Sequence, residues 1–138
     1  MRVALDSSAV WSILKGEPQG HAWLEFLIEL SREHTLVLCD VVLAEMAPYF
    51  DTINDVEAWL RDFDIQYDPI DTAAAFDAGV IFKEYRRQGG TRQRLLPDFL
   101  IAAHSSRQAQ ALATVDMGYL RRYFPTLQLV QPPRMAQP

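Results

Sequence analysis

The chain has few of the residues that build disulfide or zinc centres. Cys39 is its only cysteine, so neither an intrachain disulfide nor a thiol zinc cluster can form. The histidines His21, His34 and His104 lack the mutual spacing of zinc ligands, which favours a hard cation held by oxygen atoms over zinc. The sequence also contains no glycine-rich nucleotide-binding loop of either common type.

Long apolar runs are missing as well. No run approaches the roughly 20 residues that span a bilayer, and Asp6 interrupts the apolar start, unlike the apolar region of a signal peptide. The sequence therefore predicts a cytoplasmic protein without membrane association. Its 138 residues, 49% of them hydrophobic, suffice for one globular domain, which we expect to cover residues 1–130. The tail 131–138 holds three of the eight prolines and is expected to be mobile.

Charge is unevenly distributed along the chain. The net charge of −5 argues at first against a nucleic-acid partner. Residues 51–71 hold seven acidic residues and one arginine, whereas residues 83–94 hold five basic residues and one glutamate. Local potential governs how a polyanion approaches, so the second segment predicts a clamp for the RNA backbone. Its candidate residues are Arg86, Arg87, Arg92 and Arg94.

Short apolar runs alternate with helical periodicity. We expect strands at residues 2–5, 36–39, 65–70, 111–115 and 127–130. Helices are expected at residues 9–15, 54–63, 72–87, 98–108 and 117–123, with a long amphipathic helix before the second strand and another, capped by Asp40, after it. Parallel neighbours need helical crossovers, so the pattern predicts an α/β fold whose mainly parallel sheet is covered on both faces.

Four carboxylates stand where this fold would form a site. Asp6 and Asp116 directly follow predicted strands, and sites in parallel sheets form beyond the carboxyl ends of the strands. Glu45 and Asp98 lie on predicted helices, on or beside the faces expected to pack inward. Because carboxylates are costly to bury alone, this grouping predicts a shared cation.

Each acid also has a simpler structural explanation. Asp6 and Asp116 could cap the helices that follow them, and Asp98 would be favoured by the positive end of its own helix after Pro97. Glu45 could be a surface residue, although its helical neighbours are apolar. The simultaneous presence of all four favours a common site.

The ordered motifs resemble those of the PIN-domain ribonucleases, and among them the VapC-type toxins of bacterial toxin–antitoxin pairs. The matching segments are Leu-Asp-Ser-Ser at residues 5–8, Leu-Ala-Glu at 43–45, Pro-Asp-Phe-Leu-Ile-Ala-Ala at 97–103 and Ala-Thr-Val-Asp at 113–116. Residues 119–125 and the strand at 127–130 are also similar to that family, so the resemblance runs essentially end to end.

The resemblance implies a three-layer α/β/α sandwich with a central parallel sheet. It implies an acidic pocket for Mg²⁺ or Mn²⁺, with catalytic and metal-binding roles for Asp6, Glu45, Asp98 and Asp116. Ser7 and Thr114 match positions where the family often has a hydroxyl residue that supports the pocket. Asp40 departs from the family, and is expected either to cap its helix or to add negative charge at the pocket rim. The implied partners are an RNA substrate, a cognate antitoxin and a second copy of the chain.

Physical chemistry agrees with that implication. Clustered carboxylates repel one another, so without metal at least one of them is expected to have a raised pKa. Two other aspartate-dependent classes fit less well: a haloacid-dehalogenase phosphatase needs an aspartate where Ser8 stands, and a receiver domain needs a late lysine that the sequence lacks. The predicted function is a metal-dependent endoribonuclease toxin. The alternative is a catalytically idle PIN-like module that binds RNA or an antitoxin.

Overall fold

Five short strands form one entirely parallel sheet. The computed structural model describes residues 1–92, 95–116 and 118–133. Its strands are β1 (Arg2–Leu5), β2 (Thr35–Leu38), β3 (Ile65–Tyr67), β4 (Ala111–Ala113) and β5 (Leu129–Val130), in the order β3-β2-β1-β4-β5. The inner strands are almost continuously apolar and buried, as expected for a sheet covered on both faces.

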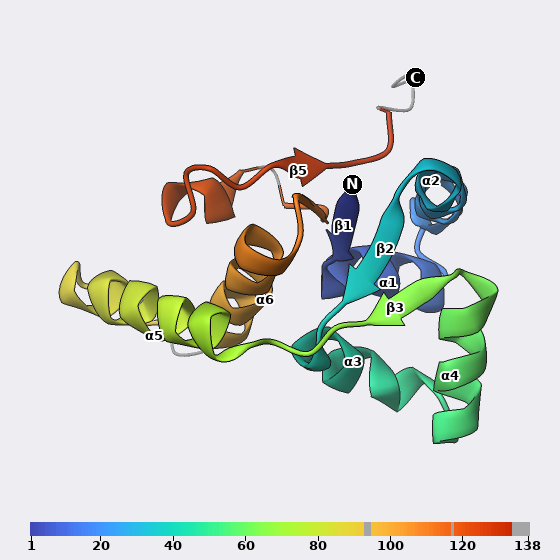
Figure 1. Ribbon diagram of the computed structural model, residues 1–138, viewed down its shortest axis with the longest axis horizontal. Coiled ribbons are helices and arrows are strands. Elements are labelled where there is room, and N and C mark those ends of the chain that lie inside the picture. Colours follow the sequence, from blue (N-terminus) through green and yellow to red (C-terminus); the bar gives the residue numbers. More distant parts are fainter. Residues whose placement is uncertain (93–94, 117, 134–138) are drawn as a thin grey trace.

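Helices connect the strands and cover the sheet. They are α1 (Ser7–Leu14), α2 (Gly20–Glu33), α3 (Asp40–Met46), α4 (Ile53–Asp62), α5 (Thr72–Arg87) and α6 (Leu95–Gln108), with 3-10 turns η1 (Ala47–Tyr49) and η2 (Tyr119–Arg122). In Figure 1, α5 and α6 lie on one side of the sheet, and α1, α2 and α4 lie on the other. The predicted α/β sandwich with a parallel central sheet is confirmed. Within the described residues no helix is both long and apolar enough to cross a membrane.

Several element boundaries differ from the sequence prediction because local capping decides them. Thr52 Oγ1 accepts a hydrogen bond from Asp55 N (3.2 Å), so α4 begins at Ile53. The expected cap at Asp40 is wrong. Cys39 is the N-cap residue of α3, and the Asp40 carboxylate instead accepts a hydrogen bond from Ile70 N (3.1 Å). Helix α6 begins at Leu95 rather than Asp98.

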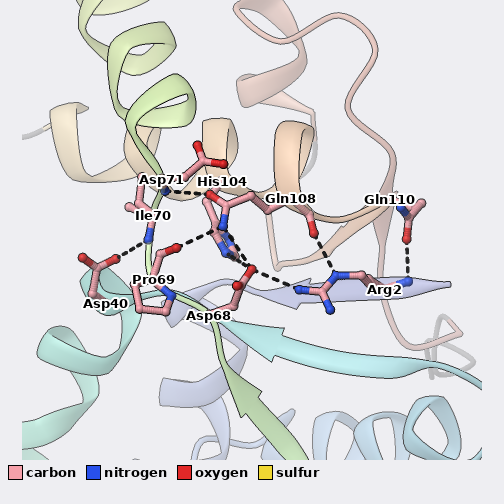
Figure 2. Close-up of polar contacts among 9 residues, drawn as sticks. All are labelled: Arg2, Asp40, Asp68, Pro69, Ile70, Asp71, His104, Gln108 and Gln110. Carbon is pink, nitrogen blue, oxygen red and sulfur yellow. Dashed lines mark hydrogen bonds and ion pairs between the residues drawn. The ribbon is translucent and has the colours of Figure 1, made fainter.

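The strand β3 ends at Tyr67, three residues earlier than expected, because the side chain of Asp68 joins a polar cluster with residues from β1 and α6. Asp68 Oδ2 lies 3.1 Å from Arg2 Nη2, 3.0 Å from His104 Nε2 and 3.2 Å from Gln108 Nε2. Gln108 Oε1 also accepts a hydrogen bond from Asp71 N (2.9 Å). Figure 2 shows these contacts gathered around the chain between β3 and α5.

The cluster joins distant parts of the chain. It ties the start of β1, through Arg2, to the crossover and to the last turns of α6. His104 is 1% exposed, and its hydrogen bond to Asp68 places it in this structural cluster. Since α6 carries Asp98 six residues earlier, the cluster helps to fix where that carboxylate lies.

Helix α2 meets α1 at a very close backbone approach. A Cβ atom on Gly20 would lie 2.3 Å from Ser12 O of α1, a distance that real Cβ atoms do not adopt. In contrast, a Cβ on Gly79, in the middle of α5, would meet nothing within 4 Å. The two glycines therefore have opposite roles: the first permits packing, and the second only weakens a helix.

We expect Gly20→Ala to lower the free energy of unfolding by about 1–3 kcal/mol, because α1 and α2 must separate. Gly79→Ala should raise it by about 0.5–1 kcal/mol, because alanine is the better helix former. Urea denaturation of both variants and the wild type measures these changes. An unchanged stability in Gly20→Ala would contradict the close approach of α1 and α2.

Candidate active site

The sheet places Asp6 and Asp116 side by side at its carboxyl edge. Strands β1 and β4 are parallel neighbours in which Leu5 pairs with Ala113, so the residues that follow them leave the sheet together. The ladder extends one step further, because Asp6 N donates to Ala113 O (2.9 Å). The predicted meeting of these two strand ends is thus built into the register.

Asp6 is held by a set of short hydrogen bonds. Its Oδ1 accepts from Ser7 N (2.9 Å), which caps α1, as the simpler structural explanation predicted. Its Oδ2 accepts from Ser8 Oγ (2.7 Å) and Thr114 Oγ1 (2.6 Å). The predicted contact of Thr114 with the acids is therefore present. Ser8 Oγ also accepts a hydrogen bond from Val115 N (3.1 Å). Ser8 was not expected at the site, and the only sequence signal for it was the second hydroxyl residue after Asp6.

Glu45 projects from α3 toward the start of α1. Its side chain is half-buried, and Ser7 Oγ donates to Glu45 Oε1 (2.7 Å). Trp11 Nε1 donates to the backbone oxygen of Glu45 (3.2 Å) and fixes α3 against α1. Ser7 thus links two of the acids, with its amide on Asp6 and its hydroxyl on Glu45.

Asp116 caps the turn that follows β4. Its Oδ1 accepts from Gly118 N (3.2 Å) and Tyr119 N (2.9 Å), and its Oδ2 accepts from Leu120 N (2.8 Å). The expected helix at 117–123 is the 3-10 turn η2, and Met117 lies outside the described residues. These three backbone amides fix the orientation of the Asp116 carboxylate.

The pKa of Asp98 depends on the other three carboxylates. Burial, the largest cause, and the negative charges of Asp6, Glu45 and Asp116 together raise the pKa of Asp98 to about 6. The expected raised pKa in a metal-free cluster is therefore confirmed, and it falls on Asp98. Among the described residues no hydrogen-bond donor reaches its carboxyl group, so nothing offsets the repulsion.

The donor chemistry of this cluster fits a hard divalent cation. The side chains are all carboxylates, with two neighbouring hydroxyls, and the electrostatic potential at Asp98 is negative. In the part of the chain that is described, no three acidic, histidine or cysteine side chains already enclose an ion position. The arrangement is compatible with Mg²⁺, which usually retains several waters and uses few carboxylates directly.

The predicted basic residues divide into three groups. Arg87 pairs with Glu84 at 3.4 Å on the exposed end of α5. Arg86 lies over the ring of Phe82, 5.9 Å from its centroid, and Arg92 follows in the loop after α5. Arg94 lies outside the described residues. Of the predicted tail, residues 134–138 also lie outside them, whereas Gln131 donates to Asp116 O (2.8 Å).

Comparison with known proteins assigns the family. The model of the PIN domain family matches residues 3–125, which is most of the chain. The protein therefore belongs to the PIN domain family. No curated protein matches the sequence at a significant level.

Solved structures share the fold. One chain in the crystal structure of VapBC2 from Rickettsia felis, bound to a promoter DNA fragment, superposes with a TM-score of 0.71 over 95% of this chain and 98% of that one. A chain of VapBC-1 from nontypeable Haemophilus influenzae gives 0.69 with the same coverage, and one of FitAcB from Neisseria gonorrhoeae gives 0.59 over 94% and 97%. Each is 20% identical, so the likeness is one of fold.

Removing the charge of Asp98 should stabilise the metal-free protein at neutral pH. The folded state holds the Asp98 proton more tightly than the unfolded chain, so ionisation lowers stability as pH rises from about 4 to about 6. A rise from 3.8 to about 6 corresponds to at most about 3 kcal/mol. Because Asp98 is exposed to water, screening should reduce this to about 1–2 kcal/mol for Asp98→Asn.

Denaturation in EDTA at pH 7.5, 6.0 and 5.0 measures this gain, which should be full at pH 7.5 and shrink toward pH 5. Asp51→Asn, at an exposed acid in the loop before α4, is the matched control and should change stability little at any pH. A loss of stability in Asp98→Asn at pH 7.5 would contradict the prediction that the charge on Asp98 destabilises the metal-free protein.

Proposed function

We propose that the protein is a metal-dependent endoribonuclease, and that Asp6, Glu45, Asp98 and Asp116 form its active site. The observation that supports this most is that the negative charges of Asp6, Glu45 and Asp116 all act on Asp98 and add to the effect of burial in raising its pKa, so the four carboxylates lie near one another. Such a group is unfavourable for stability and is explained by a cation that neutralises it. Membership of the PIN domain family supports the same activity.

In this proposal, water attacks the phosphorus of an RNA phosphodiester in line with the leaving oxygen, and the phosphorus–oxygen bond to that group breaks. A bound Mg²⁺ or Mn²⁺ would lower the pKa of the water and stabilise charge on the phosphate. The four carboxylates would hold the metal, directly or through waters. Ser7, Ser8 and Thr114 keep Glu45 and Asp6 in fixed orientations through their hydroxyl groups. No covalent enzyme intermediate is needed.

A second candidate is a catalytically idle PIN module that binds RNA or an antitoxin. The observation that favours it is that no three candidate ligands within the described residues already enclose an ion position. The two candidates differ in metal dependence, because only the nuclease requires a divalent ion to act on RNA.

We expect the wild type to cut RNA with Mg²⁺ or Mn²⁺ and to be inactive in EDTA. Glu45→Gln should lower the rate at least about 10- to 100-fold, because a neutral amide binds a divalent cation more weakly than a carboxylate does. Its oxygen can still accept from Ser7 Oγ, so the fold should persist. Glu57→Gln, at an exposed position on α4, is the matched control and should cut normally. Wild-type rates in Glu45→Gln would place Glu45 outside the site.

We further propose that the chain is the toxin of a toxin–antitoxin pair. The structures named above are VapBC and FitAcB complexes, which supports an antitoxin partner for this chain. An apolar cavity of about 200 Å³ between α2 and residues 131–133 includes Trp23 and Val115. A segment of an antitoxin placed there would contact Val115, the residue directly before Asp116, and could bring a basic side chain to the acids.

A homodimer is the remaining part of this proposal. On α2, Trp23 and Leu27 are buried and Ile28 is 40% exposed. Helix α5 supports an interface better, because Phe76 and Val80, one turn apart, are 70% and 51% exposed. Sedimentation equilibrium of the purified chain tests the dimer, and a monomer at micromolar concentration would contradict it.

Expression of the chain alone should slow bacterial growth, because cleavage of cellular RNA is toxic. Expression of Asp98→Asn to the same level should not, since the variant retains the fold but not the site. The measurement is the growth rate after induction, with RNA ends mapped in the same cultures. Equal growth of wild type and variant in several hosts, with no new RNA ends, would leave the idle module as the better interpretation.

A further inference from the structure

A second candidate site lies where α5 ends. A cavity of about 260 Å³ is lined by Phe82, Arg86, Gly90, Thr91 and Arg92, and we call it the arginine pocket. Its lining contains two guanidinium groups, a hydroxyl and the edge of an aromatic ring. None of the four carboxylates of the candidate active site lines it.

Tyr85 fixes the loop side of the pocket. Gly90 N donates to Tyr85 O (3.0 Å), and Arg92 N donates to the Tyr85 hydroxyl (3.0 Å). A Cβ on Gly90 would lie 2.3 Å from Tyr85 Cζ, so the backbone rests directly on the ring. The loop from Gly90 to Arg92 is therefore held by a single buried tyrosine.

The helical side of the pocket is ordered by the same aromatic residues. Arg86 lies over the Phe82 ring, and Phe82 stacks on Tyr85 with ring centroids 6.1 Å apart. Among the described residues, neither Arg86 nor Arg92 has a carboxylate partner, whereas the adjacent Arg87 pairs with Glu84. Two unpaired arginines in a protein of net charge −5 require an explanation.

The pocket shares its supporting aromatic cluster with the acidic site. The Tyr85 ring meets Phe99, at a centroid distance of 5.8 Å, and Phe99 directly follows Asp98. Burial raises the pKa of Tyr119, and the positive charge of Arg92 acts against that rise, so the two lie near each other. Tyr119 N in turn donates to Asp116 Oδ1. The arginine pocket and the acidic cluster are thus connected through Tyr85, Phe99 and Tyr119.

We propose that the arginine pocket binds a backbone phosphate of single-stranded RNA next to the bond that is cut. The inference rests on the proposed nuclease function. Guanidinium groups form paired hydrogen bonds to phosphate oxygens, and Thr91 adds a hydroxyl donor. An acidic site repels a polyanion, so a neighbouring positive pocket is needed to hold the strand in place.

An acidic side chain of a partner protein has similar chemistry, but the position favours RNA. A strand that places one phosphate at the carboxylates must carry its next phosphates past the adjacent surface, where the pocket lies. A protein carboxylate has no such requirement. The experiment below separates the two ligands.

The test compares Arg86→Gln and Arg92→Gln with Arg32→Gln as the matched control. Arg32 is an exposed arginine near the end of α2, where it pairs with Glu29 at 2.9 Å, and it lies outside the pocket. Binding of a fluorescein-labelled single-stranded RNA is measured by anisotropy in EDTA between 50 and 300 mM KCl, so that the RNA stays intact. Each pocket variant should weaken binding several-fold and lower the slope of log affinity against log salt by about 0.7. Arg32→Gln should change neither quantity.

Cleavage is measured separately with Mg²⁺, where the pocket variants should raise KM more than they lower kcat. Wild-type affinity and slope in both pocket variants would overturn the inference even if the wild type cuts RNA. Equal losses in all three variants would also overturn it, since they would indicate a diffuse positive surface. Unchanged RNA binding with weakened antitoxin binding would assign the pocket to the protein partner. A wild type that binds RNA through the pocket but never cuts it would refute the nuclease function instead.

Discussion

The parallel pairing of β1 with β4 is the constraint on which the rest of the structure depends. Strand β1 has neighbours on both sides, β2 and β4, and its last residues stand level with those of β4. To reach β4 from β3, the chain must pass over β2 and β1 by way of α5 and α6. That long crossover places α6, and with it Asp98, on the face opposite α1. The carboxylates therefore meet because of strand order.

The cost of grouping four carboxylates is shared unequally. Asp6 receives an amide and two hydroxyls, Asp116 receives three amides, and Glu45 receives one hydroxyl. These donors orient three of the carboxylates, whereas no donor among the described residues reaches Asp98, whose pKa is raised by burial and by the three negative charges. The far end of α6 is secured by the contacts of His104 and Gln108 with Asp68. A strongly held helix can carry an unfavourable charge at its other end, which is a common arrangement at functional sites.

The sequence was sufficient to predict the fold class and the meeting of the strand-end acids, because apolar runs and strand order are local signals. Helix faces were enough to place Glu45 on a half-buried face, but Asp98, which was expected to face packed protein, is exposed. Boundaries that depend on distant partners could not be predicted. Asp40 looks like a helix cap in the sequence, but its carboxylate accepts a hydrogen bond from Ile70 N, thirty residues away. The role of Ser8 could not be predicted for a similar reason, because it depends on contacts with Thr114 and Val115, which follow β4.

The basic segment shows the same limit of sequence-based prediction, because residues that look equivalent in the sequence differ in the fold. In sequence, Arg86 and Arg87 are equivalent neighbours in a basic run. In the fold, the two side chains point in different directions from the helix, so Arg87 pairs with Glu84 and Arg86 lies over the ring of Phe82. Gly90 then allows the loop to return across Tyr85 and bring Arg92 to the same cavity. A net negative protein thereby gains a small positive site beside its acidic one, because the aromatic cluster that supports Asp98 also determines which arginines remain unpaired.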